Sequence, residues 1–132
     1  MNNNQIVLEN QSRHSFDQTV DMIVADAERR EWTVPAVHDL QKSLAKSGKS
    51  VRPVKVIEIC KPEYSGQMLE LNHERIISVM MPCRISVYEK EDGQTYVCTL
   101  NARNMVSGLS ENIARVMTAA SDEVSDIATV VT

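Results

Sequence analysis

An Asp-Gly pair in the second half of the chain limits the possible folds more than any other feature. Asp92-Gly93 lies between two segments rich in strand-forming residues, 84–90 and 95–100. An Asp-Gly pair between such segments is the strongest short-range signal for a β-hairpin. Because two strands joined by a tight turn run antiparallel, the chain is not expected to form an all-parallel sheet.

Side chains that cap helix N-termini predict two amphipathic helices. Ser15 is followed three residues later by Gln18, which is the pattern of a capping box, and apolar residues then recur at helical spacing. Ser110 precedes the longest helical pattern, whose apolar stripe runs to Val131. Shorter helices are expected after Asp39, Pro62 and Asn101.

The strongest predicted strand is 54–60, in which Val and Ile dominate. Alternation along this strand puts Glu58 and Cys60 on the same face. Two weaker strands are expected at 5–9 and 32–37, and a proline within the second one favours a position at the edge of the sheet.

These elements alternate β, α, β, α, β, α, β, β, α, with no internal repeat and no linker between them. The order predicts a single α+β domain over 1–132, with a mixed or antiparallel sheet and helices packed against it. The 132 residues are 42% hydrophobic and 24% charged, which is typical of a globular domain and not of a disordered chain.

Charge and hydropathy exclude several classes of partner. The net charge is -4 and the chain has no polybasic run, so we expect no binding to nucleic acid or to an anionic membrane. The apolar runs are too short for a membrane-spanning helix. Residues 1–4 are polar and uncharged, unlike a secretory signal, so we expect a cytoplasmic protein.

The chain has three cysteines, which are Cys60, Cys83 and Cys98. Their spacing contains no C-x-x-C, so neither a zinc ribbon nor a thioredoxin-type motif is present. In the cytoplasm these cysteines are expected to be thiols. Cys98 lies in the middle of a predicted strand, which favours packing in the core.

Three segments, taken in order and spacing, resemble a known family. They are 15–20 at the start of the first helix, Ile59-Cys60-Lys61-Pro62, and 81–96 through the hairpin. Together they are similar to the bacterial domain-of-unknown-function family 302 over about residues 6–109, with the helix at 110–131 beyond them. The resemblance implies a compact α+β domain with a mixed sheet that is often dimeric in crystals. The family has no established activity, so no reaction or cofactor is implied.

Two cysteines stand where this family usually has other residues. The chain has Cys60-Lys61-Pro62 in place of Gly-Asn-Pro, and Met81-Pro82-Cys83 in place of Leu-Pro-Leu. This pair of thiols suggests a cysteine-bearing branch of the family and a site at Cys60 and Cys83. The sequence leaves three roles possible for this pair, namely a reversible disulfide, the carriage of sulfur and the binding of a soft metal. The alternative is packing, because free cysteine is often buried.

Three charged residues near the cysteines in sequence are candidates for tuning the thiol pKa. Glu58 on the face of Cys60 would raise the thiol pKa unless a cation is near. Lys61 and Arg84 adjoin Cys60 and Cys83 in sequence and are the candidate cations. The alternative for Glu58 is a solvated position on an open face of the sheet.

A metal site is a further hypothesis. Cys60, Cys83 and His73 would give three ligands with an open position, and the thioethers of Met80 or Met81 would suit Cu(I). A surface histidine and core-filling methionines are the alternatives. The sequence identifies no cofactor and no substrate, and it does not decide whether a reaction is catalysed.

Two functions follow from these residues. The first is a dimeric thiol site that binds a soft metal or handles a thiol or persulfide, in which Cys60 and Cys83 lie within disulfide or shared-ligand range. One of these two thiols is then expected to have a lowered pKa and to react faster than Cys98. The second is an interaction module without chemistry. We expect self-association because the last helix ends in apolar residues, unless that stripe packs on its own sheet.

Overall fold

The fold is built on a five-stranded antiparallel sheet with the strand order β1-β5-β4-β3-β2. The computed structural model describes residues 6–132, so Gln5 of the first predicted strand and the segment 1–4 lie outside the described residues. The strands are β1 (Val7–Gln11), β2 (Thr33–Asp39), β3 (Val54–Cys60), β4 (Cys83–Glu89) and β5 (Thr95–Leu100).

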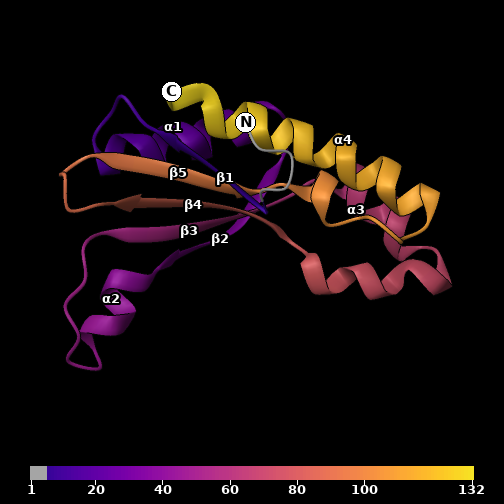
Figure 1. The fold of residues 1–132 in the computed structure, drawn as a ribbon, viewed down its shortest axis with the longest axis horizontal. Coiled ribbons are helices and arrows are strands. Elements are labelled where there is room, and N and C mark those ends of the chain that lie inside the picture. Colours follow the sequence, from indigo (N-terminus) through magenta and orange to yellow (C-terminus); the bar gives the residue numbers. More distant parts are fainter. Residues whose placement is uncertain (1–5) are drawn as a thin grey trace.

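Two long helices, α1 (Phe16–Arg29) and α4 (Glu111–Ala128), cover one face of this sheet (Figure 1). We call the opposite face, which α1 and α4 leave uncovered, the outer face. Beyond one end of the sheet, α4 continues over α3 and the 3-10 helix η1. The remaining elements are α2 (Leu40–Ala45), α3 (Pro62–Leu69), η1 (Asn72–Met80), η2 (Ala102–Asn104) and η3 (Thr129–Val131). The predicted α+β class is therefore confirmed.

The local signals for element ends are confirmed one by one. The hydroxyl of Ser15 accepts a hydrogen bond from the backbone N–H of Gln18 at 3.3 Å, and that of Ser110 accepts from Ile113 at 3.2 Å. The proline-containing strand β2 lies at an edge of the sheet. Gly93 adopts a φ of 78° in the tight turn between β4 and β5, a conformation that glycine adopts without steric cost.

One element, η1, was not predicted. Its first residue has no side-chain cap, and its apolar pattern is weak because Ile76 and Val79 are 68% and 84% exposed. Only Ile77 in this segment is buried. The first strand also begins later than expected, at Val7, and β2 extends to Asp39.

The buried residues form two clusters that α4 connects. The main cluster lies between the sheet and the two long helices and includes Ile23, Ile57, Ile85, Val97 and Ile127. The second cluster lies beyond the sheet, where the first half of α4 packs on α3 and η1, and includes Met68, Ile77, Ile113, Val116 and Met117. The fold therefore has a junction between two apolar clusters along one helix.

The apolar end of the last helix packs within the chain. Ile127 and Val131 are buried in the main cluster, and only Val130 of this end is substantially exposed. The stripe packs on its own sheet, which is the alternative left open by the sequence analysis, and self-association stays a prediction. No helix within the described residues combines the length and apolarity that crossing a bilayer requires.

The main cluster supplies a direct test of the fold. Ile85 in β4 is 0% exposed, and we expect Ile85→Ala to lower the free energy of unfolding by about 2–5 kcal/mol, because it leaves a cavity among fixed neighbours. Ile76→Ala is the matched control, since Ile76 is 68% exposed, and its effect should stay within about 0.5 kcal/mol. Chemical denaturation measures both, and equal losses in the two variants would contradict this packing.

Candidate functional site

A pocket of about 280 Å³ lies at the junction of the two clusters. It forms where β3 ends and β4 begins, and α3, the end of η1 and the middle of α4 complete its walls. Six of its fourteen lining residues carry sulfur, namely Cys60, Met68, Met80, Met81, Cys83 and Met117. Most of the others are apolar. The pocket is therefore rich in soft donor atoms and poor in oxygen and nitrogen.

The register of β3 against β4 brings Cys60 and Cys83 to this pocket. Ile59 pairs with Cys83, so Cys60 lies one residue farther along β3. Strand spacing and rise then put the two α-carbons ~6 Å apart, but alternation directs adjacent side chains to opposite faces, so this spacing alone does not make a disulfide. Both residues are free thiols that line the same pocket. A separation of their sulfur atoms within disulfide or shared-ligand range stays a prediction.

Cys83 is the more deeply placed thiol. Burial raises the pKa of Cys83 to about 11, and the neighbouring Cys60 adds to the rise. The expectation of a lowered thiol pKa is therefore wrong for Cys83, because desolvation disfavours the thiolate and no cation offsets it. The sulfur of Cys60 instead lies 3.7 Å from the hydroxyl oxygen of Ser65 in α3.

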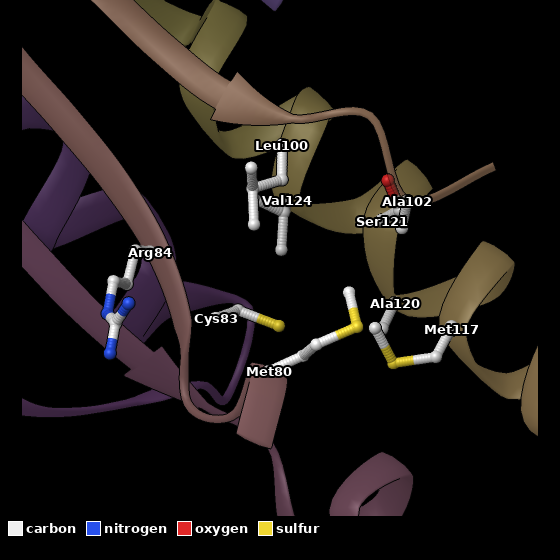
Figure 2. A pocket seen from close by; sticks show the side chains of 9 residues that line it. All are labelled: Met80, Cys83, Arg84, Leu100, Ala102, Met117, Ala120, Ser121 and Val124. Atoms are coloured by element: carbon white, nitrogen blue, oxygen red, sulfur yellow. The ribbon is translucent and has the colours of Figure 1, made fainter. Parts of the chain in front are cut away.

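Two of the three proposed tuning residues lie away from the thiols. Glu58 and Arg84 pair across β3 and β4 on the outer face. Glu58 Oε1 lies 2.9 Å from Nε2 of His38, and Glu58 does not line the pocket. Figure 2 shows the guanidinium of exposed Arg84 pointing away from the sulfur of Cys83. Strand alternation explains both positions, because the residue after Cys83 faces the other side of the sheet.

The third tuning residue, Lys61, lines the pocket next to Cys60. Its ammonium donates to the carboxylate of Glu123 at 3.1 Å and to the backbone carbonyl of Arg30 at 3.2 Å. It also lies over the rings of Trp32 and Tyr64, at 6.0 and 5.8 Å from their centroids. The cation therefore lies at the pocket wall, held by groups from three other elements.

Glu123 is a site residue that the sequence analysis missed. Its carboxylate accepts from the indole N–H of Trp32 at 3.1 Å, from the hydroxyl of Tyr64 and from Lys61. Burial alone would raise the pKa of Glu123, but these hydrogen bonds outweigh it and the pKa is lowered. The hydrogen bond from the Tyr64 hydroxyl to Glu123 is the largest cause that raises the pKa of Tyr64 to about 12. No sequence signal identified Glu123, because its partners are distant in the chain.

The three-ligand metal set of Cys60, Cys83 and His73 is not formed. His73 is exposed in η1 and does not line the pocket. Among residues 6–132, no three His, Cys, Asp or Glu side chains gather in a way that could hold a metal ion. The two methionine candidates, Met80 and Met81, both line the pocket.

The prediction that Cys98 packs in the core is wrong. Its register partners Glu9 and Ser86 place it on the outer face, where it is half-buried. Burial raises the pKa of Cys98, and Glu9 adds to the rise. Cys98 is thus separated by the sheet from the helix-covered side on which Cys83 lies.

Comparison with known proteins identifies a family and a fold. The family described as Domain of unknown function DUF302 matches residues 8–131. The crystal structure of an uncharacterized conserved protein DUF302 from Bacillus stearothermophilus is similar, with a TM-score of 0.87 and 13% sequence identity. The similarity covers 97% of this chain and 99% of that one. At this identity it supports the fold alone, and no curated protein matches the chain.

The carboxylate of Glu123 makes stability depend on pH. Because its pKa is lowered in the folded protein, its stabilisation is complete above the ordinary glutamate pKa and is lost as the pH falls through the lowered value. We expect Glu123→Gln to cost roughly 1–3 kcal/mol at neutral pH and less in acid. Denaturant unfolding at both pH values measures this, with Glu91→Gln on the exposed hairpin as control. An equal cost at both pH values would contradict the role of the charge.

The thiol of Cys83 is expected to resist alkylation near neutral pH. In the folded protein its rate should keep rising towards pH 11, because burial disfavours the reactive thiolate. In denaturant the same thiol should follow the ordinary pKa of about 8.5. Iodoacetamide labelling resolved by mass spectrometry measures both rates, and a folded-state rate that levels off near neutral pH would refute the assignment.

Proposed function

The chain belongs to the DUF302 family of domains of unknown function, and within that family we propose that it binds a thiophilic metal ion through Cys60 and Cys83. The single observation that carries the proposal is the concentration of sulfur around one pocket. Two thiols and four thioethers line it, and they come from β3, α3, η1, β4, α4 and the turn that precedes β4.

The donor types favour a soft metal. Thiolate and thioether ligands select ions such as Cu(I), whereas hard cations prefer carboxylate and carbonyl oxygens. On binding, each coordinating cysteine exchanges its proton for the metal, so that an S–H bond breaks, an S–metal bond forms and a proton is released. A metal deprotonates a coordinating thiol outright, so burial of the free thiol does not prevent ligation.

Sulfur transfer has less support than metal binding. A thiol that accepts or passes on sulfur needs its thiolate form in the free protein, since the thiolate is the nucleophile. Cys83 is held in its neutral form at ordinary pH by its surroundings. Cys60 alone would then carry the chemistry, and the second cysteine would have no role in it.

Lys61 supports the proposal by its position. It follows Cys60 directly, and its ammonium is fixed at the pocket wall by Glu123 and by the carbonyl of Arg30. A cation near a forming thiolate stabilises the charged form. Because Glu123 already offsets most of this charge, Lys61 can neutralise part of a thiolate–metal complex without leaving an isolated buried cation in the metal-free protein.

An interaction module is the second candidate, and the outer face favours it. Half-buried Val54, Val56, Tyr88 and Tyr96 share this face. Apolar side chains that gather on an uncovered sheet face commonly mark a contact with another protein, and a second copy of the chain would be one such partner. In that function the cysteines serve packing only.

A Cu(I) competition experiment separates the two candidates. The wild-type protein, titrated without oxygen against a chromogenic Cu(I) chelator, is expected to withdraw the metal. Cys83→Ser, and the double variant that adds Cys60→Ser, should weaken binding roughly tenfold or more, because even supporting residues around a metal contribute about 10–100-fold. Cys98→Ser is the matched control, since Cys98 lies on the outer face, and it should bind as the wild type does.

Two results would overturn the proposal. One is a wild-type protein that fails to compete for Cu(I) and also takes up neither Ag(I) nor Hg(II). The other is a double variant, Cys60→Ser with Cys83→Ser, that binds as tightly as the wild type. Either result would favour the interaction module, whose sign is a dimeric mass in light scattering that substitution of Tyr88 on the outer face reduces.

A further inference from the structure

We propose that Cys83, Met80 and Met117 form a charge-neutral site for monovalent copper at the inner end of the pocket. The inference rests on the proposed function and names the metal and its ligands. These three residues also line a second, smaller cavity of about 30 Å³ that adjoins the first. They therefore lie between the two cavities.

The three sulfur atoms converge from separate elements. Met80 ends η1, Cys83 begins β4 and Met117 lies in the middle of α4. Figure 2 shows the sulfur of Cys83 directed towards Met80, and the thioether ends of Met80 and Met117 directed towards the same space. Three donors from three elements around one cavity are the arrangement that a three-coordinate ion requires.

This convergence follows from the two apolar clusters. Met80 and Met117 belong to the second cluster, whereas Cys83 packs against the main cluster. The clusters meet at Ala120 of α4, whose small side chain lines both cavities. Methionine fills irregular gaps of this kind, and here its sulfur atoms gather beside the thiol of Cys83.

Charge balance selects a monovalent ion. One thiolate with Cu(I) has no net charge, and thioethers add none. A divalent ion with the same ligands would leave a net positive charge, and two thiolates with Cu(I) would leave a net negative one. Because a net charge in apolar surroundings is costly, the neutral combination is the stable one. Soft thiolate and thioether donors also prefer Cu(I) among the common biological metals.

The lining of the smaller cavity suits a bare ion better than a water molecule. A volume of about 30 Å³ exceeds the roughly 10–15 Å³ that one water needs. An ordered water also needs two or more polar partners. The lining offers the side chain of Ser121, and the guanidinium of Arg84 points away. The sulfur atoms are the donors that face this space.

The larger pocket provides the entry path. Cys60 lines the larger pocket and not the smaller cavity, so an ion that enters through the larger pocket meets Cys60 before the inner ligands. In the transfer step the Cys60–copper bond breaks and the Cys83–copper bond forms. The proton of the Cys83 thiol moves to Cys60, so charge is conserved and no oxidant or reductant is needed. The two cysteines thus have different roles, as acceptor and as final ligand.

Methionine variants test this site separately from the thiols. Met80→Leu and Met117→Leu preserve side-chain volume, and each should weaken Cu(I) binding roughly tenfold or more in the chelator competition. Met22→Leu is the matched control, since Met22 lines neither cavity, and its binding should equal that of the wild type. Met81→Leu changes a residue that lines only the larger pocket and should weaken binding less than Met80→Leu does. Thermal unfolding verifies that the variants are folded.

A second measurement needs no variant. With methionine methyl groups labelled by 13C, stoichiometric Ag(I), which is a redox-inert monovalent probe, should shift the resonances of Met80 and Met117. The resonance of Met22, which packs on the main cluster from α1, should not move. X-ray absorption of the copper-loaded protein should show sulfur donors alone.

The outcomes separate this inference from the proposed function. If Met80→Leu and Met117→Leu bind Cu(I) as the wild type does while the cysteine variants do not, the thiol site stands and the methionine ligands are refuted. If Met81→Leu weakens binding as much as the other two variants do, the assigned ligand set is wrong. If the wild type binds neither Cu(I) nor Ag(I), the proposed function and the inference are both overturned.

Discussion

The length of the apolar stripe on α4 determines most of this structure. The helix has 18 residues and is therefore ~27 Å long, whereas the six-residue strand β5 that it crosses spans ~20 Å. The sheet cannot cover the whole stripe, and α3 and η1 bury the part that extends beyond it. The second apolar cluster, the junction between the clusters and the pocket at that junction all follow from this mismatch.

A polar cluster stabilises the same junction. Glu123 on α4 is bound by Trp32 at the start of β2, by Lys61 at the end of β3 and by Tyr64 in α3. These bonds join the helix to the ends of two strands near the hollow. Within the described residues, no buried side-chain nitrogen or oxygen lacks a hydrogen-bond partner. The hollow is therefore framed by satisfied polar groups, and its soft sulfur donors face the space inside.

Local features of the fold could be predicted from the sequence, and those that depend on tertiary placement could not. The caps at Ser15 and Ser110 and the turn at Asp92-Gly93 are encoded by neighbouring residues, and they are confirmed. The family is confirmed. The two cysteines line one pocket, and their pairing stays a prediction. Whether Glu58 and Arg84 lie beside the thiols could not be decided from the sequence, because it depends on which face of the sheet the helices cover.

The site itself was only half predictable. Lys61 and the two cysteines could be selected by residue type and sequence position. Glu123 and Met117 could not, because α4 brings them to β3 and β4 from more than about 30 residues away. The high pKa of Cys83 was missed for a related reason. The adjacent arginine suggested a nearby cation, whereas strand alternation directs its charge to the other face.

The proline of the edge strand β2 has a consequence for how this protein meets its copies. An edge strand exposes a row of unpaired donors and acceptors to which a strand of another molecule can add. Pro35 has no N–H, and the register of β2 against β3 is irregular between Thr33 and Ala36. This edge is therefore a poor template for continuous strand addition. The β2 edge of the sheet is therefore protected against the edge-to-edge strand pairing that leads to fibril growth.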